Sequence, residues 1–124
     1  MFTCFIKYVV DLDKINVFEE YAHLWIKLIE KYGGTHHGYF LPDKNLSELP
    51  REPFSFPNLG KQGPNNIAVA LFSFPDLKTY NAYKRNVAED KECKEAMIRF
   101  NETKCFLSYE RTYLKPVFKG NHTL

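Results

Sequence analysis

The chain has 124 residues, which is the usual size of one domain and long enough to bury a hydrophobic core. Lys and Arg number 17 against 15 Asp and Glu, so the formal net charge is +2, and no basic run is present. This balance argues against a protein that binds nucleic acid. Aromatic residues make up 16% of the chain, and such side chains often line cavities and interfaces, although a bulky core explains most of them.

Residues 2–10, with the sequence FTCFIKYVV, predict a β-strand buried on both faces, because neither of its alternating sets is strongly polar. Asp11 or Asp13 is then expected to cap a helix. From residue 15 onward one apolar stripe recurs with the helical period. Its members are Ile15, Phe18, Ala22, Trp25, Ile29 and Tyr32. A second stripe predicts that the helix buries more than one side. It consists of Val17, Tyr21, Leu24 and Leu28.

The segment YGGTHHGYF, residues 32–40, predicts the passage from this helix into a second strand. Gly33 suits the left-handed residue that ends a helix. The strand is expected over residues 35–41, where strict alternation separates two faces. One face carries Thr35, His37, Tyr39 and Leu41, and the other carries His36, Gly38 and Phe40. Because a glycine inside a strand often marks a bulge, a shift of one residue at Gly38 would exchange His37 for His36.

Residues 42–66 hold five of the seven prolines and predict a long loop or arm. A loop of this length in a compact domain is either functional or draped over another surface. We therefore expect the arm to pack against a subunit interface or to cover the mouth of a cavity. The apolar residues available to anchor it are Leu46, Leu49, Phe54, Phe56 and Leu59.

The rest of the chain has the same order of strand, helix and strand. IAVALFSF, residues 67–74, predicts the third strand, and Asp76 and Asp90 are expected to cap two successive helical segments. The first segment carries Leu77, Tyr80, Tyr83 and Val87, and the second carries Ala96, Met97 and Phe100. The last strand, residues 105–114, ends before Pro116, and residues 119–124 predict a disordered tail. Its alternation groups Cys105, Leu107, Tyr109, Arg111 and Tyr113 against Phe106, Ser108, Glu110, Thr112 and Leu114.

This order of elements predicts an α+β domain over residues 1–118 with the ferredoxin-like plan β-α-β-β-α-β. Right-handed crossovers place both helices on one face of a four-stranded antiparallel sheet, with the second and fourth strands at its edges. The strands are apolar on both faces, yet nothing remains in the chain to cover the second face. We therefore expect a homodimer in which two sheets pack face to face as a dimeric α/β barrel.

Three short motifs resemble the NIPSNAP family, which belongs to the dimeric α/β-barrel superfamily. YNAYKRNVAEDKECKEAM, residues 80–97, resembles its helix after the third strand, and YGGTHHGYF resembles its helix-to-strand passage. YLKPVF, residues 113–118, resembles its closing strand. The likeness covers most of residues 1–118, whereas the arm 42–66 and the pair Cys4 and Ile6 depart from the family pattern. The resemblance supplies no reaction to carry over, since superfamily relatives include cofactor-free monooxygenases, lactone isomerases and haem enzymes.

The sequence therefore predicts a NIPSNAP-like dimer that binds a small hydrophobic or aromatic ligand inside the barrel. One alternative is a small cofactor-independent enzyme of the monooxygenase or isomerase type, with an interior histidine as general base. A second alternative is a non-catalytic dimeric protein with a role in stress or in protein interaction. A closed, aromatic-lined cavity holding a histidine of perturbed pKa favours the enzyme, and a cavity filled by side chains favours the non-catalytic protein.

The candidate site is expected in the barrel interior. His37 is the candidate general base, with His36 as the alternative if the strand is shifted. The candidate ligand-binding residues are Tyr8, Tyr39, Tyr109 and Arg111. Of these, Tyr109 and Arg111 share a strand face and offer a hydroxyl and a fixed cation to an anionic ligand. The competing interpretation is a histidine hydrogen-bonded at a sheet or dimer surface and an arginine that is only a solvated charge.

No metal or cofactor is predicted. Adjacent histidines in a strand face opposite ways and cannot chelate one metal ion, and nothing else indicates a metal or haem ligand set. Cys4, Cys93 and Cys105 show no metal-ligand spacing and are interpreted as free thiols in a reducing compartment. The sequence shows neither a signal peptide nor an apolar run long enough to span a bilayer, so a soluble cytoplasmic protein is expected.

Overall fold

The computed structural model describes residues 1–43, 56 and 58–117. Its elements in chain order are β1 (Phe2–Val10), a 3-10 turn η1 (Leu12–Lys14), α1 (Ile15–Lys31), β2 (Thr35–Phe40), β3 (Ile67–Phe74), α2 (Leu77–Val87), α3 (Lys91–Thr103) and β4 (Phe106–Leu114). The predicted tail and most of the predicted arm, including Leu46, Leu49 and Phe54, lie outside the described residues. Phe56 and Leu59 are 75% and 83% exposed, so neither is anchored to the body of this chain.

The four strands form one antiparallel sheet in the order β2-β3-β1-β4. This order confirms the predicted ferredoxin-like plan, with β2 and β4 at the edges. The second crossover contains two helices, α2 and α3, as the two predicted caps require. Asp76 accepts a hydrogen bond from the Thr79 N–H at 2.7 Å, and Asp90 accepts one from the Glu92 N–H at 2.8 Å.

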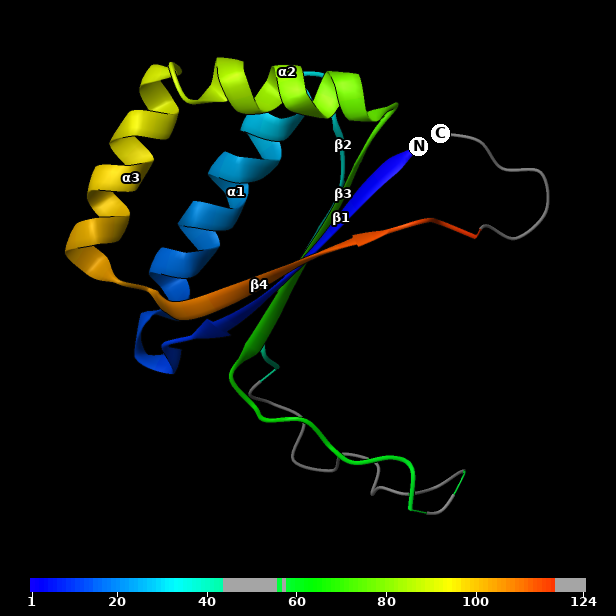
Figure 1. The fold of residues 1–124 in the computed structure, drawn as a ribbon. Helices are drawn as coiled ribbons and strands as arrows, with labels where there is room; N and C mark the ends of the chain where they lie inside the picture. Colours follow the sequence, from blue (N-terminus) through cyan, green and yellow to red (C-terminus); the bar gives the residue numbers. More distant parts are fainter. Residues whose placement is uncertain (44–55, 57, 118–124) are drawn as a thin grey trace.

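All three helices lie on the same side of the sheet (Figure 1). Every second residue of the two central strands faces them, and their cross-strand pairing keeps these residues in register. The buried members are Cys4, Ile6, Tyr8 and Val10 in β1 and Ala68, Ala70, Phe72 and Phe74 in β3. Helix α1 adds Phe18, Leu28 and Ile29. The hydrophobic core is therefore confined to this helix-covered face, and we call the opposite surface the open face.

The two ends of α1 follow from local chemistry. Asp11 caps the η1 turn by accepting a hydrogen bond from the Asp13 N–H at 3.0 Å, so the prediction that either aspartate caps α1 itself is wrong. At the other end Gly33 has a φ of +95°, as predicted for a residue that ends a helix. Gly34 is required for space, because a Cβ there would lie 2.6 Å from Ile29 Cγ2 and 2.8 Å from Phe74 Cζ.

Strand β2 contains a bulge that changes which side chains share a face. His36 pairs with Phe72 and Gly38 pairs with Leu71, so that His37 is an extra residue between two consecutive pairs. Gly38 takes a φ of +118°, which glycine adopts without strain. The strict alternation predicted for this strand is therefore wrong beyond His37, and the shifted alternative at Gly38 is the observed arrangement.

Strand β4 contains a similar irregularity at its start. Val9 pairs with Ser108 and Val10 pairs with Phe106, which leaves Leu107 as the extra residue. Phe106 therefore joins the helix-covered face rather than the face predicted for it, and Leu107 is exposed. Beyond this point the predicted alternation is observed, since Tyr109, Arg111 and Tyr113 pair with the inward residues of β1.

Candidate functional site

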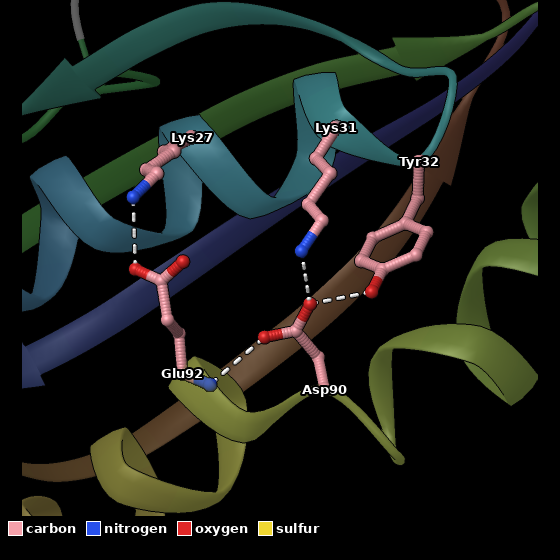
Figure 2. Close-up of polar contacts among 5 residues, drawn as sticks. All are labelled: Lys27, Lys31, Tyr32, Asp90 and Glu92. Carbon is pink, nitrogen blue, oxygen red and sulfur yellow. Dashed lines mark hydrogen bonds and ion pairs between the residues drawn. The ribbon is translucent and has the colours of Figure 1, made fainter.

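Helix α3 packs mainly against α1, and polar contacts at its N-terminal end fix its position (Figure 2). The buried carboxylate of Asp90 accepts hydrogen bonds from the Lys31 ammonium at 2.7 Å and from the Tyr32 hydroxyl at 2.5 Å. Lys27 and Glu92 add an ion pair at 2.9 Å between the two helices. The hydrogen bonds from Lys31 and then Tyr32 hold the pKa of Asp90 well below its usual range, so this carboxylate stays charged.

Two pockets of about 250 Å³ and about 70 Å³ lie between the sheet and the helices. Both are lined by Ile6, Tyr8, Tyr21, Trp25 and Arg111, so the two spaces share one wall. We call the two together the sheet–helix pocket. The larger space is completed by Met97, Phe100, Phe106 and Tyr109, and the smaller by Ile29, Tyr39, Phe72 and Tyr83. A wall made largely of aromatic rings suits a planar apolar ligand.

Three tyrosines bring hydroxyl groups to this wall. The Oη atoms of Tyr8 and Tyr39 lie 3.5 Å apart, and the ring of Tyr21 meets that of Tyr8 edge-on at 6.2 Å between centroids. Burial raises the pKa of Tyr8, and it raises the pKa of Tyr21 and of Tyr39 well above the ordinary value. All three phenols are therefore neutral near pH 7 and keep a proton that they can donate in a hydrogen bond.

Trp25 contributes the polar group that most plainly lacks a partner. Its indole N–H is buried, and within the described residues nothing accepts a hydrogen bond from it. Trp25 lines both parts of the sheet–helix pocket. A buried donor without a partner costs about 1–3 kcal/mol, so an acceptor group on a ligand would relieve that cost.

His36 lies on the helix-covered face and stacks on Tyr39, with ring centroids 5.0 Å apart and planes 12° apart. Its Nδ1 accepts a hydrogen bond from the Gly38 N–H at 2.9 Å, which leaves the proton of the neutral ring on Nε2. This Nε2 is buried and has no partner among the residues that the structure describes. Burial, and then the nearby His37, lower the pKa of His36 to about 4, so the ring is neutral at physiological pH.

His37 lies on the open face, apart from the other candidate residues. Its Nε2 is 2.9 Å from the Ser73 Oγ, which in turn is 2.8 Å from the Thr3 Oγ1. Both hydroxyl residues are buried, whereas His37 is exposed. The β2 bulge therefore removes His37 from the predicted set and puts His36 on the same face as Tyr39.

The four predicted ligand-binding residues do lie on one face, but it is the helix-covered face. Tyr8, Tyr109 and Arg111 line the larger part of the sheet–helix pocket, and Tyr39 lines the smaller part. They were expected in the interior of a barrel formed by two sheets, which would lie against the open face. That placement differs from the structure, because the rows of β1 and β4 that carry these residues point toward the helices.

The helical half of the wall was not predicted. Tyr21, Trp25 and Phe100 belong to apolar stripes that were interpreted as core, and all three line the larger space. The signal present in the sequence was the unusually wide apolar arc of the first helix, which exceeds what one buried side requires.

Within the described ranges, no cluster of three or more His, Cys, Asp or Glu could hold a metal ion. Cys4, Cys93 and Cys105 are buried free thiols, and burial raises the pKa of each. None of the described helices combines the length and apolar character needed to cross a bilayer.

Comparisons with known proteins place the fold among NIPSNAP structures. A NIPSNAP domain protein from Burkholderia xenovorans is 18% identical with a TM-score of 0.66, covering 94% of this chain and 95% of its own. A NIPSNAP family protein of unknown function from Agrobacterium tumefaciens is 16% identical with a TM-score of 0.67, covering 98% and 92%. A Nitrosomonas europaea protein described as an antibiotic biosynthesis monooxygenase is 11% identical with a TM-score of 0.60, covering 95% and 100%.

At these identities the likeness establishes the fold and nothing finer. The family resemblance predicted from three short motifs agrees with it, because the chain has the fold of NIPSNAP family proteins over most of its length. No protein-family model matches the sequence, and no curated protein matches it significantly.

Proposed function

We propose that this protein, which has the fold of NIPSNAP family proteins, binds a small hydrophobic or aromatic ligand in the sheet–helix pocket. The observation that carries the proposal is an aromatic-walled space of about 250 Å³ beside a buried indole N–H. Rings on the wall supply apolar contact area, and Trp25 supplies a directional donor that lacks an acceptor within the described residues. This combination of an apolar wall and a few polar groups is typical of small-molecule sites.

The catalytic alternative has less support. A general base works best when its pKa lies near the working pH, and the pKa of His36 is lowered to about 4. His37 is bonded to Ser73 on the open face, where it does not reach the sheet–helix pocket. Likeness to the Nitrosomonas protein keeps a cofactor-independent monooxygenase in view as the second candidate. His36 would serve as its general base only once Nδ1 is released from the Gly38 N–H, because Nε2 carries the ring proton. Loss of turnover in His36→Gln with ligand binding retained would favour that second candidate.

We also propose that two copies associate through the open face. This surface carries apolar side chains around Lys7 of β1, with Phe5, Val69 and Leu71 half-buried and Phe40 60% exposed. No helix in the described part of the chain covers it (Figure 1). An exposed apolar patch of this kind marks an association surface. Sedimentation equilibrium at micromolar concentration should give twice the mass of the chain, and a monomer there would refute the dimer.

The ligand proposal can be tested with two tyrosines that differ in little except their place. Tyr109 and Tyr113 are 54% and 53% exposed, and both stand on the same face of β4. Tyr109 lines the larger space, whereas Tyr113 lines neither part of the sheet–helix pocket. Tyr109→Ala should therefore weaken ligand binding several-fold, and Tyr113→Ala should not.

The probe is para-nitrobenzamide, a neutral nitroaromatic that quenches tryptophan emission. Trp25 is the only tryptophan in the chain, so emission reports directly on the pocket wall. We expect saturable quenching in the unchanged protein, a several-fold larger Kd in Tyr109→Ala and an unchanged Kd in Tyr113→Ala. Quenching that rises linearly without saturation is collisional, and it would refute a binding site beside Trp25.

A further inference from the structure

We propose that the ligand of the sheet–helix pocket carries an anionic group, a carboxylate or an equivalent, which binds to Arg111. This inference rests on the binding function proposed above and names the chemical class of its ligand. In this assignment Arg111 binds the anionic group of the ligand, and the aromatic wall contacts the apolar remainder of the ligand.

The walls of the pocket have one sign of charge. The residues that line its two parts include Arg111 and no Asp or Glu. They are otherwise apolar residues, Trp25 and tyrosines, and burial raises the pKa of Tyr8, Tyr21 and Tyr39 so that these stay neutral. A lone cation in surroundings that are less polar than water attracts an anion more strongly than it would in bulk solvent.

Arg111 has no acidic partner within the described residues. Among these residues its guanidinium donates a hydrogen bond from Nη1 to the Tyr80 hydroxyl at 2.5 Å, and that phenol is neutral because burial raises its pKa. The ion pairs that the described residues form all involve lysines, His23 or Arg99, and none involves Arg111. A guanidinium has five N–H donors, so several remain to bind a carboxylate in the two-pronged geometry that arginine favours.

A neighbouring pocket shows the contrast. A space of about 220 Å³ between α1 and α3 is lined by Val17, Leu24 and Ala96 among others, and it also contains an arginine, Arg99. There the guanidinium is neutralised by Glu20, which lines the same pocket and lies 2.7 Å away. The two pockets therefore differ in net charge although each includes one arginine, and only the sheet–helix pocket offers an uncompensated cation.

A second donor in the sheet–helix pocket fits the same ligand. The indole N–H of Trp25 is buried without a partner among the described residues, and Trp25 and Arg111 line both parts of the pocket. A carboxylate has two oxygens and several acceptor sites, enough for the guanidinium and a further N–H donor. A neutral apolar ligand would leave the indole N–H and the remaining N–H groups of the guanidinium without an acceptor.

The test compares two probes of one shape, para-nitrobenzoate and para-nitrobenzamide, by saturable quenching of Trp25 and by calorimetry. The charged probe should bind about ten-fold more tightly or better, as expected for a hydrogen-bonded charge pair. Arg111→Gln should remove this preference, so that the two probes bind this variant with similar Kd values. Arg111→Lys should retain part of the preference, because the charge remains and the fork geometry does not.

The matched control is Arg85→Gln, which removes the same charge from an exposed position on α2 outside the pocket. It should leave the preference intact. Equal Kd values for the two probes in the unchanged protein would overturn the anion assignment while leaving the ligand-binding function standing. Arg85→Gln losing the preference as fully as Arg111→Gln would also overturn it, since attraction would then come from net charge. Failure of both probes to bind would refute the binding function itself.

Discussion

The two faces of this sheet are made from the same strands and differ in what covers them. On the helix-covered face, inward residues such as Ile6 and Ala70 are buried by helices of their own chain. On the open face, their sequence neighbours Phe5 and Leu71 are only half-buried although they are equally apolar. The covered face thus carries the stability of the single chain and the sheet–helix pocket, whereas burial on the open face would add stability only when another surface covers it.

Ala70 and Leu71 are consecutive residues of β3 that face opposite sides of the sheet, so substitutions there distinguish the two faces. Ala70 is 0% exposed and faces the helices, so Ala70→Glu would force a bulky carboxylate into the packed core between its pairing partners Ile6 and Tyr39. Such a change costs more than about 4 kcal/mol, enough to unfold a domain of ordinary stability. Circular dichroism should show little native structure at room temperature. A cooperative thermal transition like that of the unchanged protein would contradict our assignment of the core.

Leu71→Glu is the matched change on the open face. Leu71 pairs with Phe5 and Gly38, and its side chain points away from the helices. We expect this variant to keep its fold and its quenching by para-nitrobenzamide, because the pocket is on the other face, but to sediment as a monomer. An unchanged dimer would show that the association uses a different surface.

Replacing Asp90 tests whether its polar contacts hold α3 in the position where that helix forms part of the pocket wall. Asp90→Ala removes the cap of α3 and its contacts with Lys31 and Tyr32 (Figure 2). We expect the midpoint of thermal unfolding to fall by ~5 °C, together with weaker ligand binding because α3 supplies part of the wall. Differential scanning calorimetry measures the first effect, and Trp25 quenching measures the second.

Glu92→Ala is the control for this cluster. It removes an exposed ion pair with Lys27 and leaves the carboxylate of Asp90 in place. Exposed pairs contribute little, so the midpoint should move by about 2 °C or less. Equal losses in the two variants would mean that the buried carboxylate has no special part in holding α3.

The last expected effect, absent at neutral pH, is a pH dependence that arises on the covered face. Burial lowers the pKa of His36 from 6.5 to about 4, so the unfolded chain binds more protons than the folded one between these values. Above pH 6.5 His36 therefore causes no loss in the free energy of unfolding, and the loss grows as the pH falls toward about 4. The loss is at most about 3 kcal/mol, an upper limit because the ring is partly exposed.

His36→Phe keeps a ring stacked on Tyr39 and removes the titrating group. Urea unfolding at a series of pH values should show a shallower decline for this variant than for the unchanged protein. The control is His23→Gln, which removes an exposed histidine of α1 and leaves the buried imidazole in place. A decline that stays as steep in His36→Phe would assign the effect to another group.

The fold could be predicted because its signals are local. Apolar periodicity marks each strand and helix, Gly33 marks the end of α1, and Asp76 and Asp90 mark the starts of α2 and α3. Each of these depends on residues within one turn or one strand. The order of the strands then follows from the handedness of the crossovers.

The candidate site could be predicted only in part, because it depends on register and on distant contacts. One extra residue in β2 separates His37 from Tyr39, and alternation alone cannot locate such a residue. The helical wall depends on the contact between Lys31 and Asp90, which are 59 positions apart in the chain. No local pattern contains that pairing, so Tyr21, Trp25 and Phe100 were interpreted as ordinary core.

Because of the bulge in β2, His37 could be deleted without changing which side of the sheet the other residues of that strand face. If His37 were deleted, His36 would precede Gly38 directly, and ordinary alternation would keep His36 and Tyr39 toward the helices without a left-handed glycine. Deleting Tyr39 would instead turn Phe40 toward them. Related chains can therefore differ by one residue here and still present the same faces. An alignment of such chains must open its gap at His37, or every later residue of the strand is assigned to the wrong side.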